Sequence, residues 1–206
     1  EKQTIADKVD NAYSECETIA RNASSSFFRS FRHLPNHKRR AVNSLYAFCR
    51  RVDDIVDGDW LPQVDLSHLD ESALERSLQM SVDRQQDLDP GPEHISKVKA
   101  LLYYRLNLDS IEQGKAQSDP IFIALADVYK KFPIELDNLR ELITGMEDDL
   151  FATNYERFEQ LRQYCYRVAS TVGLCLVEIY GYNDPNARRH AVEMGIYLQM
   201  VNVLRD

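Results

Sequence analysis

The stretch AVNSLYAFCRRVDDIVDG, residues 41–58, decides the fold, because its apolar residues recur at the spacing of an α-helix. The glycine at its end is a common helix stop. Three carboxylates, Asp53, Asp54 and Asp57, interrupt the apolar pattern. At about 100° per residue, Asp57 falls about 40° from Asp53, and Asp54 falls about 100° away. The spacing therefore predicts that Asp53 and Asp57 point together into one space.

The stripe that holds Asp53 and Asp57 also carries Tyr46 and Arg50, and apolar residues flank it. Burying a carboxylate without a partner is costly, so a buried pair needs a cation or hydrogen bonds. Magnesium prefers oxygen ligands and is often completed by the phosphates of a substrate. The pair therefore favours a divalent-cation site. The alternative is that Arg50 neutralises both carboxylates on a solvated helix face.

A second polar stripe lies in the last stretch, MGIYLQMVNVLRD, residues 194–206. Gln199, Asn202 and Asp206 fall on one narrow face of an otherwise apolar helix. The stripe contains no lysine or glutamate, the residues typical of a solvated face. It predicts oxygen ligands for a second cation, with a buried hydrogen-bond network between helices as the alternative. Arg205 adjoins it, and arginine beside a hard cation suits a diphosphate.

Composition places the chain among globular proteins. Its 206 residues are 44% hydrophobic and 28% charged, which suits one sizeable domain. The net charge of -8 disfavours nucleic-acid binding, since phosphate backbones attract basic surfaces. No apolar run is long enough for a membrane span. The four cysteines are scattered through apolar stretches, which favours free buried thiols in a reducing cytosol.

Helical periodicity continues along the whole chain, and no alternating strand pattern is found. A small polar break is expected at residues 23–27, and Asp184 before Pro185 suits the start of the last helix. The expected fold class is therefore all-α. Helices are predicted over residues 4–22, 35–57, 71–88, 94–112, 120–132, 134–151, 158–181 and from 184 to 206.

Three segments, YAFCRRVDDIVD, YCYRVASTVG and LQMVNVLRD, together resemble the squalene/phytoene synthase family of head-to-head prenyl transferases. The likeness runs from about Tyr13 to Asp206. It implies the isoprenoid synthase fold, a helical bundle around a central cavity with aspartate-rich motifs on opposing helices. Family members continue through further helices. Residues 1–206 are therefore expected to form a single all-α prenyl synthase domain that is truncated at its C-terminal end.

The resemblance also implies roles for individual residues. It assigns metal binding to two pairs of side chains, Asp53 with Asp57 and Asn202 with Asp206. Tyr164, the first tyrosine of YCYRVAS, matches a residue implicated in the chemistry of the cationic intermediate, so Asp53, Asp57, Tyr164 and Asp206 form the expected catalytic set. The residues expected to bind substrate are Ser24, Ser26, Phe27, Tyr46, Arg50, Gln199, Asn202 and Arg205.

Two further segments are compared with the family pattern. Ser170 stands where the family has glycine, a replacement of small by small with little expected consequence. The segment GMEDDL, residues 145–150, resembles a family segment outside the main metal motifs. For its acidic residues, a cluster at a helix end is the favoured interpretation.

The function that the resemblance implies is the Mg²⁺-dependent, head-to-head condensation of two identical prenyl diphosphates. The favoured product is phytoene from geranylgeranyl diphosphate. The alternatives are presqualene diphosphate, squalene or dehydrosqualene from farnesyl diphosphate, and NADPH is needed only for squalene. A protein of another class, a non-catalytic assembly or binding protein of the same fold, would not need inward carboxylates. The expected partners are prenyl diphosphates and no nucleic acid, and the expected location is the cytoplasm with peripheral membrane contact for release of a lipophilic product.

Overall fold

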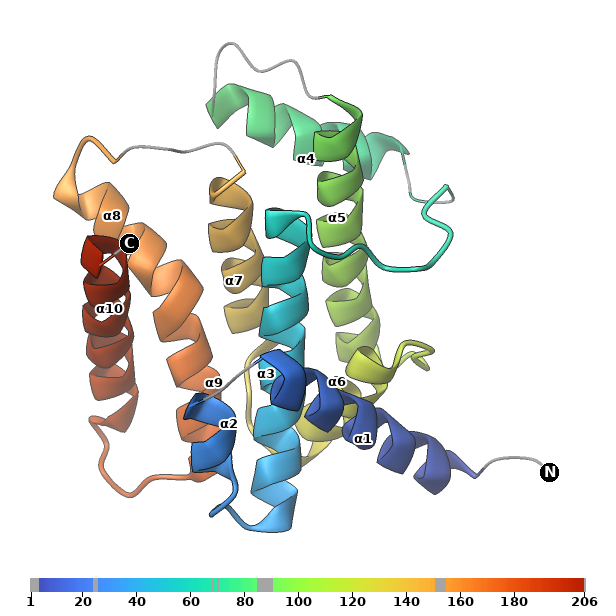
Figure 1. Cartoon of the computed structure of the whole chain (residues 1–206), viewed down its shortest axis with the longest axis vertical. Coiled ribbons are helices and arrows are strands. Elements are labelled where there is room, and N and C mark those ends of the chain that lie inside the picture. Colours follow the sequence, from blue (N-terminus) through green and yellow to red (C-terminus); the bar gives the residue numbers. More distant parts are fainter. Residues whose placement is uncertain are drawn as a thin grey trace.

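The computed structural model describes residues 4–23, 26–67, 69, 71–84, 91–150 and 155–205, and within them the chain is all-α, as predicted (Figure 1). Most helix bounds agree with the sequence periodicity to within a few residues. The helices are α1 (Ile5–Ala23), α2 (Ser26–Phe31), α3 (Asn36–Asp57), α4 (Glu71–Arg84), α5 (Pro92–Glu112), α6 (Pro120–Lys131), α7 (Leu136–Asp148), α8 (Phe158–Cys165), η1 (Tyr166–Ser170), α9 (Thr171–Tyr180) and α10 (Ala187–Arg205).

Helix α3 is the centre of the bundle and packs against α1, α5, α6, α7 and α9 (Figure 1). It begins directly after Pro35, whose fixed φ suits a helix start. It ends at Gly58, which has a left-handed φ of 84° that glycine adopts without strain. Its apolar residues are buried at helical spacing, as the periodicity predicted; they include Val42, Leu45, Phe48, Val52 and Ile55.

Three aromatic rings join α3 to its neighbours in the core. Phe48 of α3, Tyr104 of α5 and Phe122 of α6 are fully buried. The Tyr104 and Phe122 ring centroids are 4.9 Å apart with an interplanar angle of 69°, and those of Phe48 and Tyr104 are 5.4 Å apart. Aromatic contacts of this kind, edge-to-face for Tyr104 with Phe122 and tilted for Phe48 with Tyr104, stabilise beyond the area that they bury, so they hold the frame that carries α3.

The segment predicted as one helix over 158–181 contains a π-helical turn, η1, between α8 and α9. A π turn inserts one residue into the α-helical register, and such turns are frequent at functional sites. Helix α7 approaches this turn closely at Gly145, where a Cβ atom would lie 2.6 Å from the Cβ of Arg167. Glycine at this position therefore permits the contact between α7 and η1.

Two other features differ from the periodicity. The break expected at residues 23–27 is shorter than predicted, because α2 begins at Ser26; residues 24 and 25 lie outside the described part. Helix α10 turns its polar residues toward the bundle. Gly195 and Ile196 are buried and Gln199 and Asn202 half-buried, while apolar residues, among them Met194, Tyr197, Leu198, Val201 and Leu204, are exposed.

The four cysteines are free thiols, as predicted, and Cys16, Cys165 and Cys175 are buried. Across the described residues, every helix is too short or too polar to cross a lipid bilayer.

Candidate functional site

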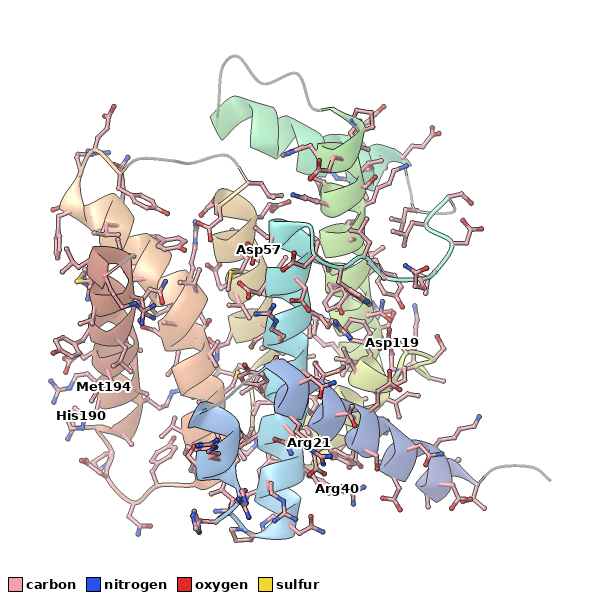
Figure 2. The ribbon with its side chains drawn as sticks, in the orientation of Figure 1. Arg21, Arg40, Asp57, Asp119, His190 and Met194 are labelled. Carbon is pink, nitrogen blue, oxygen red and sulfur yellow. The ribbon has the colours of Figure 1, made fainter. Side chains whose placement is uncertain are left out.

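The C-terminal ends of α3 and α7 point to the same end of the bundle, the upper end in Figure 1. The C-terminal end of α10 and the start of α8 lie at this end as well. Asp57 is labelled there at the top of α3 (Figure 2). Helix α7 contacts both α3 and η1, and α10 packs on η1, α9 and α8. The fold therefore gathers residues of motifs that are far apart in the sequence.

The aspartates of α3 differ in their surroundings. Arg50 Nη1 donates to Asp53 Oδ2 at 3.1 Å, and Arg50 Nη2 lies 2.6 Å from Asp54 Oδ1. Arg51 Nη1 donates to Asp54 Oδ2 at 3.1 Å. The Asp54 side chain is only 8% exposed, so the carboxylate that enters the core is Asp54, and two arginines neutralise it.

Asp53 is half-buried and Asp57 is exposed, and within the described part of the chain Asp57 has no ion-pair partner. The alternative in which Arg50 neutralises both Asp53 and Asp57 therefore does not hold for Asp57, because the guanidinium is shared between Asp53 and Asp54. Burial first, and then the charge of Asp57, raises the pKa of Asp53 above its usual value, against the opposing effect of Arg50. A carboxylate pair with too little positive charge fits a hard divalent cation.

A preformed cage is not part of this site. In the described ranges, no group of three or more His, Cys, Asp or Glu side chains could hold a metal ion by itself. Two carboxylates one helical turn apart are instead the donor set that Mg²⁺ takes when water and substrate phosphates complete its coordination.

The structure adds a carboxylate that the sequence analysis did not select. Tyr164 of α8 donates its phenol hydrogen bond to Asp149 Oδ2 at 2.9 Å. The ring of Tyr155 packs on that of Tyr164, with centroids 5.3 Å apart. Burial by surrounding atoms raises the pKa of Asp149 to about 6, the Tyr164 hydrogen bond lowers it, and the charges of Asp148, Asp53 and Asp57 raise it further. The charges of Asp53 and Asp57 therefore act on Asp149 at the end of α7, the helix that packs against α3.

The segment GMEDDL is therefore more than an acidic helix end. Arg105 Nη2 donates to Glu147 Oε2 at 2.9 Å, and Arg167 Nη1 donates to Asp148 Oδ2 at 2.9 Å. These two arginines tie the first two acidic residues to α5 and η1. Asp149 is left to bind Tyr164. The sequence signal for this arrangement was present, because Tyr164 had been selected and GMEDDL noted, but nothing in the sequence paired them.

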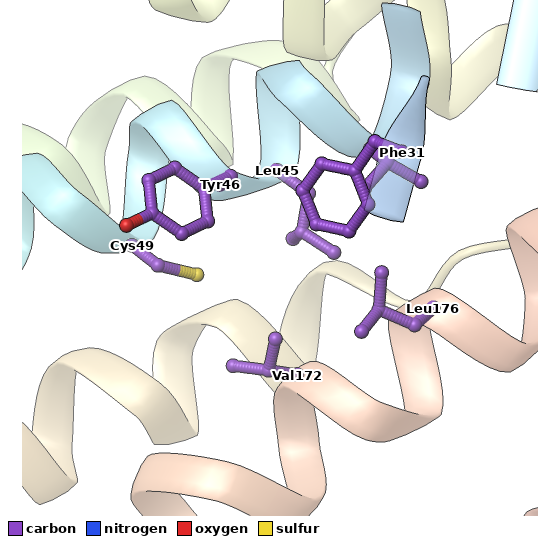
Figure 3. A pocket seen from close by; sticks show the side chains of 7 residues that line it. Phe31, Leu45, Tyr46, Cys49, Val172 and Leu176 are labelled. Carbon is purple, nitrogen blue, oxygen red and sulfur yellow. The ribbon is translucent and has the colours of Figure 1, made fainter. Parts of the chain in front are cut away.

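An apolar cavity of about 210 Å³ lies between α3 and α9 (Figure 3). Tyr46, a predicted substrate-binding residue, lines it and meets Phe31 edge-on, with ring centroids 6.5 Å apart. The lining exposes no polar surface to the cavity. Its residues are Phe31, Val42, Leu45, Tyr46, Cys49, Val172 and Leu176.

The predicted residues of α10 are brought together only in part. Asn202 Nδ2 donates to Gln199 Oε1 at 3.3 Å within α10 itself, and both side chains are half-buried. Arg205 is exposed. Asp206 and Ser24 lie outside the described residues, and so do the side chains of Ser26 and Phe27 on α2. Metal binding by Asn202 and Asp206 stays a prediction.

Ser170, the departure from the family glycine, is fully buried where η1 meets α10. Its Oγ donates to the carbonyl of Val192 at 2.7 Å. A Cβ on Gly195 would lie 2.6 Å from the Ser170 Cα, so the two helices touch through small residues. The expectation that small replaces small agrees with this packing.

An all-α bundle with carboxylates at one end and an apolar cavity within it defines the class of isoprenoid synthase folds. A solved dehydrosqualene synthase in complex with ligand matches this structure with a TM-score of 0.73 and 27% sequence identity. The match covers 98% of this chain and 59% of the dehydrosqualene synthase chain. The squalene synthase HpnC from Alicyclobacillus acidocaldarius shares the fold, with a TM-score of 0.70 and 23% sequence identity. This match covers 95% of this chain and 61% of the HpnC chain.

The sequence profile of the squalene/phytoene synthase family matches residues 20–206, and the chain belongs to this family, whose members are prenyl transferases. Phytoene synthase of Mycobacterium tuberculosis is 32% identical over 199 residues, which are 97% of this chain and 54% of the relative. The 15-cis-phytoene synthase of Synechococcus elongatus is 29% identical over 210 residues, 96% of this chain and 58% of the relative. The chain thus spans about half the length of the curated relatives that it matches.

Proposed function

We propose that the protein catalyses the Mg²⁺-dependent head-to-head condensation of two identical prenyl diphosphates and forms phytoene from geranylgeranyl diphosphate. The names of its relatives from Mycobacterium tuberculosis and Synechococcus elongatus support this product. Prenyl diphosphates are the partners, and membrane contact during release of the lipophilic product belongs to the same proposal.

One observation carries the proposal: a single face of α3 runs from an apolar cavity to a carboxylate pair. Tyr46 and Cys49 line the cavity, and Asp53 and Asp57 follow on the same face at helical spacing. From Tyr46 to Asp57 the helix rises about 16 Å at about 1.5 Å per residue. A prenyl diphosphate has the same polarity along its length, with an apolar tail and an anionic head. This face of α3 therefore suits one substrate molecule lying along it.

Each group of residues has a role in this proposal. Asp53 and Asp57 would hold Mg²⁺ with the diphosphate, and the bound ion supplies Lewis acidity that helps the diphosphate to depart. Arg50 adds a guanidinium for the remaining phosphate charge. The cavity residues exclude water from the allylic cation left by ionisation, which would otherwise be hydrolysed. The double bond of a second substrate molecule attacks that cation and gives, after loss of a proton, a cyclopropyl intermediate. A second ionisation and rearrangement lead to the linear product.

A second candidate substrate is farnesyl diphosphate, which would give presqualene diphosphate, squalene or dehydrosqualene. The similarity to a solved dehydrosqualene synthase favours it. NADPH enters only if squalene is the product.

The deciding experiment incubates the full-length protein with each diphosphate and Mg²⁺ and identifies the products by mass spectrometry. Phytoene from geranylgeranyl diphosphate, lost on chelation of the metal, is the expected result. A product from farnesyl diphosphate alone would select the second candidate. Absence of turnover with both substrates would favour a non-catalytic binding protein of the same fold.

A further inference from the structure

The pair formed by Asp149 and Tyr164 has no place in the metal and cavity roles described above. Tyr164 donates to Asp149 Oδ2 at 2.9 Å across the gap between α8 and the end of α7. The two residues are held from both sides. Arg167 of η1 bonds Asp148, the neighbour of Asp149, at 2.9 Å, and the Tyr155 ring packs on Tyr164. The pair is therefore a fixed feature at the end of the bundle that carries Asp53 and Asp57.

We propose that Asp149 is a positioning residue that acts through Tyr164, and that its carboxylate takes up the phenol proton when Tyr164 removes a proton from the prenyl cation. This inference rests on the proposed condensation, and it assigns the proton acceptor of that same site.

The step balances without any further reactant. A C–H bond beside the cationic centre breaks, and its electron pair closes the cyclopropane ring. The released proton moves to the phenol oxygen of Tyr164, while the phenol proton passes along the existing hydrogen bond to Asp149 Oδ2. Tyrosine alone is a poor acceptor, because accepting a proton on a neutral phenol would leave it cationic; the carboxylate behind it keeps the phenol neutral.

Geometry also provides the route by which the proton leaves. Asp149 keeps solvent-accessible surface, although surrounding atoms partly desolvate its carboxyl, so the carboxyl can return the proton to water, whereas Tyr164 is half-buried against the core. The tyrosine thus separates the carboxylate from the apolar interior. A carboxylate in direct reach of the allylic cation could be alkylated, and in the proposed relay only the phenol of Tyr164 meets the cation.

The electrostatic surroundings suit the same role. A pKa of about 6 leaves Asp149 mostly ionised at neutral pH and makes it a better proton acceptor than an ordinary aspartate. Burial is the largest cause of this rise. This effect of burial on the pKa of Asp149 remains when a cation offsets the charges of Asp53 and Asp57. The charged and titratable groups that face Asp149 are Asp53 and Asp57 of α3, Asp148 beside it, Tyr155, Tyr164 of α8 and, through Asp148, Arg167 of η1.

The test compares Asp149→Asn with Asp149→Glu, Tyr164→Phe and the matched control Asp148→Asn in the full-length protein. Asparagine can still accept the Tyr164 hydrogen bond but cannot take up its proton. We expect Asp149→Asn to lower kcat about a hundredfold with little change in KM, the range of a lost general base. The acid limb of the kcat profile near pH 6 should disappear in Asp149→Asn. Asp149→Glu should restore most of the rate and the limb. Asp148→Asn should keep a limb, moved to somewhat lower pH because the charge of Asp148 raises the pKa of Asp149, and should lose far less rate than Asp149→Asn.

A second measurement needs no turnover. The phenolate absorbance of Tyr164, obtained by subtracting the titration of Tyr164→Phe from that of the parent, should titrate at lower pH in Asp149→Asn. Burial is the largest cause of the raised pKa of Tyr164 and is kept in the variant, whereas the further rise caused by the charge of Asp149 is lost. An unchanged Tyr164 titration would show that the pair does not exist in solution and would overturn the inference.

The outcomes separate the two proposals. An active parent whose Asp149→Asn variant keeps its rate and its acid limb overturns the relay and leaves the condensation standing. A raised Mg²⁺ requirement with an unchanged pH profile also overturns it, because Asp149 would then act on the cation. A parent that releases no diphosphate from either substrate overturns the proposed function and the relay together.

Discussion

Asp53 and Asp54 are neighbours in the sequence, and their replacement by asparagine is expected to have opposite effects. The Asp54 side chain is 8% exposed and holds two arginines, Arg50 at 2.6 Å and Arg51 at 3.1 Å. The Asp53 side chain is 40% exposed and pairs with Arg50 alone, at 3.1 Å. Asp54→Asn should therefore destabilise the fold, and Asp53→Asn should remove activity from a folded protein.

The magnitudes follow from these partners. Asp54→Asn leaves Arg50 a second carboxylate, Asp53, but removes the charged hydrogen-bond partner of Arg51, whose guanidinium lies over the Trp60 ring, 4.5 Å from the ring centroid. Removing one partner from a buried charged hydrogen bond costs about 1–3 kcal/mol. In a chain of this size that lowers the melting temperature by about 2–4 °C per kcal/mol.

Asp53→Asn removes a carboxylate whose pKa is raised by burial and by Asp57, so the apo fold should lose no stability and should gain slightly. If Asp53 is a magnesium ligand, turnover should fall by at least about a hundredfold, since metal assistance supplies several kcal/mol of transition-state stabilisation.

Thermal unfolding followed by circular dichroism and product formation in Mg²⁺ would be measured on both variants. The reasoning fails if Asp53→Asn turns over at the parental rate, or if it melts as low as Asp54→Asn. Equal loss of activity at matched stability in both variants would also refute it, because the buried position of Asp54 gives it no access to a substrate.

Three further results are expected. Mg²⁺ together with inorganic diphosphate should raise the melting temperature of the parent, because a ligand that binds only the folded state stabilises it; a shift with a prenyl alcohol and none with the pair would contradict the metal assignment. Val172→Phe should fill much of the cavity of about 210 Å³ and lower kcat/KM for geranylgeranyl diphosphate more than for farnesyl diphosphate; equal losses would mean that the cavity does not hold the tail. Gly195→Ala should lower the free energy of unfolding in urea by about 1–3 kcal/mol, because its Cβ would lie 2.6 Å from the Ser170 Cα; an unchanged midpoint would show that α10 shifts freely on η1.

The helices could be predicted to a large extent, because burial of an apolar stripe leaves a local periodic signal. The stop of α3 at Gly58 and the free cysteines followed from the same kind of reasoning. The six residues of α2 are too few to show a period, and the π turn η1 adds one residue to a helix without changing its composition. Both escaped prediction for this reason.

Within the candidate site, the sequence by itself determined which side chains can share a helix face: Tyr46, Arg50, Asp53 and Asp57 lie on one stripe because the α-helix repeats every 3.6 residues. Only the tertiary structure decided which of the α3 aspartates is buried, because that depends on the helices packed around α3. It also decided the pairing of Asp149 with Tyr164, 15 residues apart in the chain. That contact depends on how the end of α7 packs beside α8 and η1, where Gly145 permits a close approach, and a distance between two helices is set by packing that no local repeat records.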